Sequence, residues 1–128
     1  HSVTTMDECI FEQLDGSVVP KNFWQNGKAF VQHGKGFSLM DNDIIASTAF
    51  SSCIDEKVIE IGIETHEQYR GKGYAVQVCQ TLIDYCLDHQ ILPVWACRYE
   101  NQGSYRLAKK LGFLPSNYLP YYRLCKND

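Results

Sequence analysis

The stretch of sequence that decides the fold is Glu67-Gln-Tyr-Arg-Gly-Lys-Gly-Tyr-Ala-Val76. It follows a run rich in β-branched residues, Val58–Thr65, and it leads into a long amphipathic segment that starts near Gly73. A strand, a tight turn and a helix N-terminus in this order form an anion site, because the first N–H groups of a helix have no partner within it and the helix dipole adds positive charge there. The stretch therefore predicts a phosphate site between a strand and a helix.

The residues of the turn fit a phosphate ligand. Gly71 and Gly73 let the backbone come close to a phosphate without a side chain in the way, and Arg70 and Lys72 add positive charge around it. The spacing differs from the Gly-x-x-x-x-Gly-Lys-Ser/Thr nucleotide loop and from the Gly-x-Gly-x-x-Gly dinucleotide pattern. Another class of phosphate-bearing ligand is therefore indicated.

The rest of the sequence predicts an α/β (α+β) fold. The expected strands are 36–40, 44–53, 58–65, 92–97 and 118–125, and the expected helices are 6–14, 22–32, 74–89 and 101 or 103–111. Helix 74–89 carries apolar residues at i, i+3, i+4 and i+7 spacing. The first three strands should form an antiparallel meander, and 92–97 should run parallel to 58–65 because a helix crosses between them. We expect a mixed, mostly antiparallel sheet flanked by helices.

Composition restricts the class of protein. With 128 residues, 45% of them hydrophobic, the chain can form one core, and no second domain is expected. Its formal net charge of −3 argues against nucleic acid as a partner, because nucleic-acid binders usually carry a basic face. The sequence has no apolar run of about 18 residues and no signal-peptide pattern. We therefore expect a cytoplasmic protein without a membrane partner.

The cysteines point to packing and not to metal binding or disulfides. They form no Cys-x-x-Cys pair and no His stands at zinc-finger spacing, so no metal site is expected. In a reducing cytosol we expect small buried thiols. A nucleophilic Cys97 is the alternative, although no His stands near it in the sequence. The six are Cys9, Cys53, Cys79, Cys86, Cys97 and Cys125.

Two blocks of the sequence resemble one known family, the GCN5-related N-acetyltransferases (the GNAT superfamily). That family's pyrophosphate loop reads Arg/Gln-x-x-Gly-x-Gly/Ala, and Gln68, Gly71 and Gly73 fill those places. The second block is Asn101-x-x-Ser104-x-x-Leu107-Ala-Lys-Lys-Leu-Gly-Phe113, which is similar to the family's Asn followed by a helix ending in Lys-Leu-Gly-Phe. The resemblance covers residues 37–124.

Within the superfamily, the chain looks most similar to a bacterial branch. That branch has an Ile-Glu-Ile-x-Ile-x-Thr pattern, which stands here at 59–65, and a Pro-x-Trp-x-Ala pattern, whose counterpart is Pro93-Val-Trp-Ala96. The branch often carries an additional N-terminal region, and this chain begins with His1-Ser2. We therefore expect residues 1–128 to be a single GNAT domain. Residual tag residues and the C-terminal part of a longer protein are both open readings of its start.

The resemblance implies acetyl-CoA as the co-substrate. In the family, the strand before the loop splays from its parallel neighbour, so we expect 58–65 and 92–97 to diverge at their C-terminal ends. Backbone groups near Ile63 and Thr65 would then pair with the pantetheine arm like an added strand. Asn101 is expected to hydrogen-bond the arm from the other side, and Ser104 either to assist it or to cap the helix. The pyrophosphate is expected on the loop formed by Gln68, Tyr69, Arg70, Gly71, Lys72, Gly73, Tyr74 and Ala75.

Two carboxylates are candidates for the general base that takes a proton from the acceptor amine. Glu60 and Glu64 alternate with isoleucines, so both lie on one face of a strand that should be central in the sheet. A buried carboxylate has a raised pKa and can accept a proton near neutrality. We place Glu60 first and Glu64 second, with a water molecule and a merely polar strand face as the alternatives.

The general acid departs from the family pattern. Many members have a Tyr two residues before Lys-Leu-Gly-Phe, and that position is Ala108 here. Tyr105, one helical turn earlier, lies on a similar face and is either a substitute acid or a packing aromatic. A thiolate is a good leaving group, so transfer can proceed without a dedicated acid.

The sequence therefore predicts an N-acetyltransferase that moves an acetyl group from acetyl-CoA to a primary amine. A non-catalytic acyl-CoA sensor and a phosphate-binding domain unrelated to CoA are the alternatives. The amine belongs to a small molecule or a peptide whose identity the sequence does not give. The sequence also leaves open whether the chain forms a homodimer.

Overall fold

The computed structural model describes residues 2–14, 19–55, 57–98, 102–115 and 121–126. Within these residues seven strands form one sheet in the order β1-β2-β3-β4-β5-β7-β6. The strands are β1 (Ser2–Thr5), β2 (Gly36–Asp41), β3 (Ile44–Asp55), β4 (Val58–Thr65), β5 (Leu92–Arg98), β6 (Phe113–Pro115) and β7 (Tyr121–Lys126). The helices are α1 (Glu8–Gln13), α2 (Gly27–His33), α3 (Tyr74–Asp88) and α4 (Gln102–Lys110), with 3-10 turns at Pro20–Asn22 and Glu67–Tyr69.

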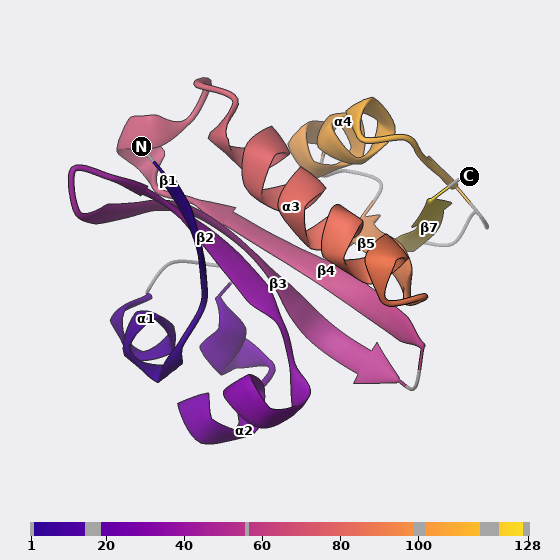
Figure 1. Ribbon diagram of the computed structural model, residues 1–128. Coiled ribbons are helices and arrows are strands. Elements are labelled where there is room, and N and C mark those ends of the chain that lie inside the picture. The colour runs from indigo at the N-terminus through magenta and orange to yellow at the C-terminus, as the bar shows by residue number, and fades with distance from the viewer. Residues whose placement is uncertain (1, 15–18, 56, 99–101, 116–120, 127–128) are drawn as a thin grey trace.

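The helices cover both faces of the sheet. Figure 1 shows α1 and α2 on one face and α3 and α4 on the other. Each face has its own hydrophobic core, one that includes α3 and α4 and another that includes α1 and α2. None of the helices in the described part of the chain combines the length and apolar character needed to cross a membrane.

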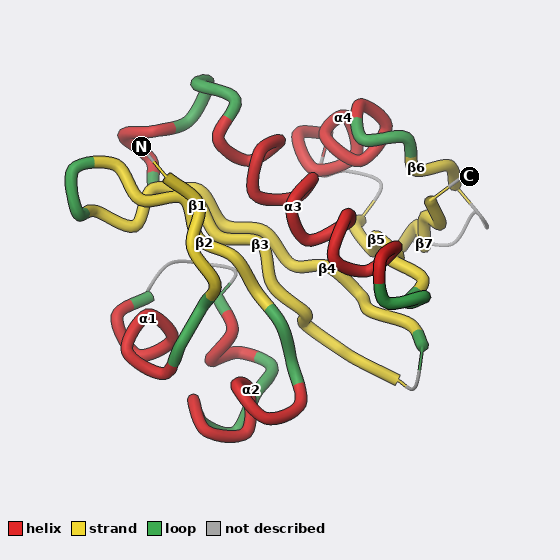
Figure 2. The backbone as a smooth tube through the Cα atoms, viewed as in Figure 1, coloured by secondary structure: helices red, strands yellow, loops and turns green. Residues whose placement is uncertain are grey.

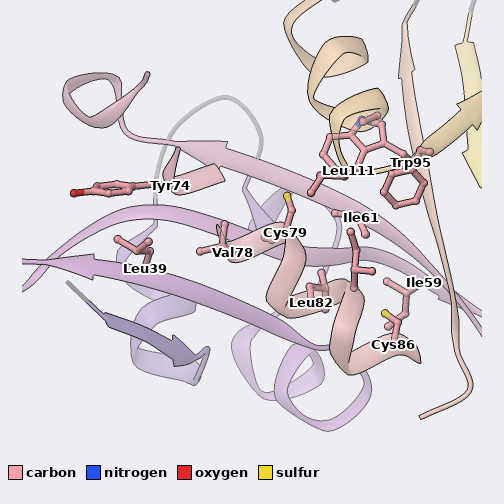
Figure 3. Close-up of a cluster of buried hydrophobic side chains, with 14 of the residues drawn as sticks. Leu39, Ile59, Ile61, Tyr74, Val78, Cys79, Leu82, Cys86, Trp95 and Leu111 are labelled. Carbon is pink, nitrogen blue, oxygen red and sulfur yellow. The ribbon is translucent and has the colours of Figure 1, made fainter. Parts of the chain in front are cut away.

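The larger core lies between α3 and the sheet. The apolar stripe of α3 buries Val78, Cys79, Leu82, Ile83 and Cys86 completely, as its periodicity predicts. In Figure 3 the α3 side chains face the sheet, with Trp95 and Leu111 near one end of the cluster and Tyr74 at the other. Burial raises the pKa of the Cys86 thiol to about 12 and raises that of Cys79 as well. Cys9, in contrast, is exposed on α1, so the expectation of buried thiols is wrong there.

The smaller core explains a glycine in the middle of β4. Phe11, Phe30 and Phe50 are almost completely buried in it. A Cβ atom built on Gly62 would lie 2.5 Å from the ring of Phe50, so the ring occupies the space that a side chain would need. Glu60 and Glu64 alternate with Gly62 along the strand and share this face. The carboxylates of β4 therefore belong to the α1 side of the sheet, whereas its isoleucines face α3.

The strand pairing confirms the expected meander and the parallel pair. β2, β3 and β4 pair antiparallel, and β4 pairs parallel with β5 from Val58↔Leu92 to Ile61↔Trp95. Beyond Ile61 the two strands have separate partners, because β4 continues along β3 to Thr65 and β5 continues along β7 to Arg98. Figure 2 shows the yellow strands parting in this region. The predicted divergence at the C-terminal ends is thus present.

Three elements differ from the sequence-based expectation. The helix expected over 22–32 is a 3-10 turn followed by α2, because the Asn26 side chain accepts a hydrogen bond from the Ala29 N–H (2.8 Å) and starts a new helix there. β1 was not predicted, since all four of its residues are exposed and no apolar alternation marks it. β6 was also missed, being only three residues long.

Candidate functional site

The end of β4 presents backbone groups to the gap beside β5. The His66 N–H donates to the Ala46 carbonyl at 2.8 Å, which places His66 among the residues that face β3. Alternate residues of an antiparallel strand direct their N–H and C=O groups to opposite sides, so Ile63 and Thr65 direct theirs to the β5 side. The Thr65 carbonyl there accepts a hydrogen bond from Arg70 Nε at 3.2 Å. This is the edge that an added strand-like ligand would occupy.

The turn after β4 needs its two glycines for their backbone conformation. Gly71 and Gly73 have φ of +82° and +79°, a region of backbone conformation that residues with a Cβ atom disfavour. A Cβ atom at either position would meet no heavy atom within 4 Å, so open space lies above both. Gly73 also precedes the first residue of α3 without a side-chain cap. The first amides of α3 consequently lack a side-chain acceptor from Gly73 at the edge of this space.

Two tyrosines fasten the turn to the rest of the fold. The rings of Tyr69 and Tyr74 are stacked at a centroid distance of 6.0 Å. The Tyr74 O–H donates to Asp41 Oδ2 at 2.7 Å, and Asp41 is the last residue of β2. This hydrogen bond, followed by burial, raises the pKa of Tyr74 above its ordinary value. The start of α3 is thereby tied to the β2–β3 hairpin.

A cavity of about 800 Å³ extends from the glycine turn to α4. Arg70, Arg106 and Lys110 bring three cations to its wall, against one carboxylate, Glu64. A cavity with this charge balance favours an anionic ligand. Its other lining residues are Ile63, Thr65, Tyr69, Gly71, Gly73, Tyr74, Ala75, Val76 and Leu107.

A second cavity, of about 300 Å³, lies at the end of β4 beside α1. Its wall includes Leu14 at the end of α1, Ile45 in β3, and the carboxylates Glu64 and Glu67. Glu64, Thr65 and Arg70 line both cavities. The end of β4 therefore lies between the two cavities and borders both of them.

Most of the predicted ligand residues are brought together by the structure. Ile63, Thr65, Tyr69, Arg70, Gly71, Gly73, Tyr74 and Ala75 all line the larger cavity. Gln68 and Lys72 are exposed in the turn and line neither cavity. Asn101 lies outside the described residues, and the side chains of Ser104 and Tyr105, in the first half of α4, are outside the described part as well.

The two candidate bases occupy different surroundings. Both are half-buried on β4, but Glu64 lines both cavities whereas Glu60 lines neither. Ala108, at the position of the usual tyrosine, is completely buried in the core with Trp95 and Phe113. That position therefore presents no proton donor.

Sequence reasoning did not assign three residues of α4 that line the larger cavity. Arg106, Leu107 and Lys110 line it, and their i, i+1, i+4 spacing places them on one side of the helix. The neighbouring Lys109 is exposed and does not line the cavity. The spacing of these residues in the sequence shows that they share one side of a helix. Only the packing of α4 against the core shows that this side lines the cavity.

Comparison with known proteins identifies the family of this chain. The sequence matches the family model of GNAT acetyltransferase over residues 2–122, so the chain belongs to the GNAT acetyltransferase family. It is 33% identical over 103 residues to the uncharacterized N-acetyltransferase YdfB of Bacillus subtilis (strain 168), a match spanning 80% of this chain and 40% of YdfB.

Solved structures show the same fold. The crystal structure of a GCN5-related N-acetyltransferase-like protein from Streptococcus suis superimposes with a TM-score of 0.81 at 26% identity, over 98% of this chain and 49% of that one. A Bacillus subtilis acetyltransferase in complex with CoA has a TM-score of 0.67 at 15% identity, over 79% of this chain and 81% of that one. The chain thus spans about half the length of YdfB and of the Streptococcus protein.

Proposed function

We propose that this chain transfers an acetyl group from acetyl-CoA to a primary amine. One observation supports this proposal above the others: the parallel strands β4 and β5 part beyond Ile61 beside a cationic cavity that begins at a glycine turn and a helix N-terminus. A long ligand with an anionic end and a polar arm fits these features together. Family membership supports the chemical class of reaction.

The anionic end of acetyl-CoA would lie on the turn. The amides of residues 71–75 and the start of α3 are the proposed donors to the pyrophosphate, with Arg70 beside them. Arg106 and Lys110 of α4 are the proposed partners of further phosphate charge from the opposite wall. The pantetheine arm would run along the β4 edge that Ile63 and Thr65 present. The thioester would then lie deeper in the gap between β4 and β5.

Acetyl transfer requires the acceptor to be deprotonated. An amine is mostly protonated near neutral pH, and only its neutral form has the lone pair that attacks the thioester carbonyl carbon. We propose Glu64 as the group that takes this proton, directly or through water, because it lines both cavities. The new C–N bond forms, the C–S bond breaks, and the products are the acetamide, CoA and one released proton.

The departing thiolate must also be protonated. Tyr105 remains our candidate for this role, because it lies one helical turn before Ala108 on α4. Solvent is the alternative donor, since a thiolate leaves readily and needs less assistance than an alkoxide would.

Turnover with amines tests the proposal. The full chain, acetyl-CoA and a panel of primary amines would be assayed for free CoA thiol, with product identified by mass spectrometry. We expect amine-dependent release of CoA together with a product heavier by one acetyl group. The absence of acetylated product for every amine tried, alongside measurable CoA binding, would contradict catalysis.

That second outcome corresponds to a different function, a non-catalytic acyl-CoA binding module. The observation that favours it is Ala108, which is buried in the core where the family commonly has a tyrosine. Calorimetry with CoA distinguishes both functions from a phosphate site unrelated to CoA. If the site were a phosphate site unrelated to CoA, inorganic pyrophosphate would bind as tightly as CoA does.

A further inference from the structure

The smaller cavity adjoins the proposed donor site. Leu14 at the end of α1 lines it, whereas residues of α3 and α4 line the larger cavity. Because Glu64 and Thr65 line both, a ligand in each cavity would meet the other at the end of β4. At about 300 Å³ it is at the lower end of the range for small-molecule sites.

The two cavities differ in the sign of their charge. The larger has Arg70, Arg106 and Lys110 against Glu64, whereas the smaller has Glu64 and Glu67 against Arg70. The side chain of Arg70 is held by its hydrogen bond to the Thr65 carbonyl, at the boundary between the two. The larger cavity therefore favours anions and the smaller one favours cations.

His66 does not reverse this balance. It lines the smaller cavity, and its Nδ1 accepts a hydrogen bond from the Gln68 N–H at 3.3 Å. In this arrangement Nδ1 is an acceptor, so it presents no N–H to a ligand in the cavity. Leu14 and Ile45 add apolar surface to the lining of the cavity.

We infer that the smaller cavity binds the acceptor and selects aliphatic amines that carry a second cationic group. The inference rests on the proposed acetyl transfer. The reacting nitrogen lies near Glu64, the alkyl chain lies against Leu14 and Ile45, and the second ammonium group lies at Glu67. A monoamine lacks the last contact, and an amine with a distal carboxylate is repelled by Glu67.

Matched acceptors test the inference. The CoA-loaded protein would be titrated calorimetrically with 1,4-diaminobutane, n-butylamine and 4-aminobutanoate, which share a four-carbon chain and differ in the distal group. Acetyl transfer to each would be measured as kcat/KM. We expect the diamine to bind and react best and the amino acid worst.

Glu67 carries the predicted selectivity. Glu67→Gln should reduce the preference for diamine over monoamine by about two- to fivefold, the range for one exposed ion pair. Glu67→Lys should move the preference towards 4-aminobutanoate. Asp88→Asn is the matched control, because it removes an exposed carboxylate in the last turn of α3, away from both cavities.

Equal binding of the diamine and the monoamine, or a preference that Glu67→Gln and Asp88→Asn leave equally intact, would overturn the inference. Acetyl transfer without diamine preference would overturn only the inference. Diamine binding that depends on Glu67 but gives no acetylated product would instead overturn the proposed function and retain the cation site.

Discussion

At the end of β4, successive residues differ in where they direct their backbone groups and side chains. Ile63 and Thr65 direct their backbone groups into the gap beside β5, and Glu64 lies between them on the α1 face. The alternation of residues along the strand thus separates the backbone groups proposed to bind the pantetheine arm from the carboxylate proposed as the base. This separation determines which single substitutions should affect catalysis and which should affect donor binding.

Glu64→Gln should lower kcat by about 10²–10⁴-fold, because the amide retains the shape of the side chain but accepts no proton at neutral pH. CoA affinity by calorimetry should remain nearly unchanged. Glu60→Gln is the matched control, because Glu60 shares the strand face but lines neither cavity. If Glu60→Gln proved the damaging change and Glu64→Gln retained wild-type turnover, the base would be Glu60.

Gly73→Glu should abolish CoA binding, because it puts a negative charge into the open space above the turn. Gly73→Gln has the same bulk and the same unfavourable φ without the charge, so the difference between the two variants isolates electrostatics from strain. Isothermal titration with CoA would measure both. Wild-type affinity in Gly73→Glu would count decisively against the turn as the pyrophosphate site.

At the scale of elements, α4 contributes Arg106, Leu107 and Lys110 to the wall of the larger cavity, which is the proposed donor site. Its two cations on that wall were not among the residues predicted from sequence, whereas the turn itself was. The turn could be predicted because a local pattern of glycines between a strand and a helix defines it. The position of α4 depends on its packing against β5, β6 and the core, and that core also includes residues of β2, β3 and α3 that are distant in sequence.

Lys110→Ala should weaken CoA binding, and the loss should diminish as ionic strength rises, because salt screens a charge at a solvent-accessible cavity. Lys109→Ala is a control on the adjacent residue, which is exposed but does not line the cavity. Affinities would be measured at low and high salt for both variants. An equal effect of the two substitutions would show that α4 acts only through its overall charge.

The Tyr74–Asp41 hydrogen bond should make the stability of the fold depend on alkaline pH. The pKa of Tyr74 is raised above 10.0 in the folded chain, so its contribution is complete below pH 10 and is lost as the pH rises through the folded value. Tyr74→Phe removes this contribution. Denaturation of both proteins should therefore show wild type more stable at pH 8, with the difference shrinking above pH 10. A difference that grew with alkaline pH would contradict the assigned bond.

At the scale of the whole molecule, the sequence predicted the meander, the parallel β4–β5 pair and α3 because strong periodicity or a recognisable turn marks each of them. β1 and β6 have neither signal, because β1 pairs with β2, which is distant in the chain, and β6 is only three residues long. For the candidate site, the glycine turn was predicted, and the sequence placed Glu60 before Glu64 as the base, whereas only Glu64 lines the cavities. Strand periodicity puts Glu60 and Glu64 on the same face, and only the cavities at one end of β4 distinguish them.

The central claim is that the parting of β4 from β5 forms a binding site for acetyl-CoA. A crystal structure of the full chain with CoA tests it most directly. We predict the pyrophosphate at the amides of residues 71–75 and the pantetheine arm hydrogen-bonded to the backbone of Ile63 and Thr65. CoA bound elsewhere on the molecule, or β4 and β5 paired along their full length beside it, would contradict the account.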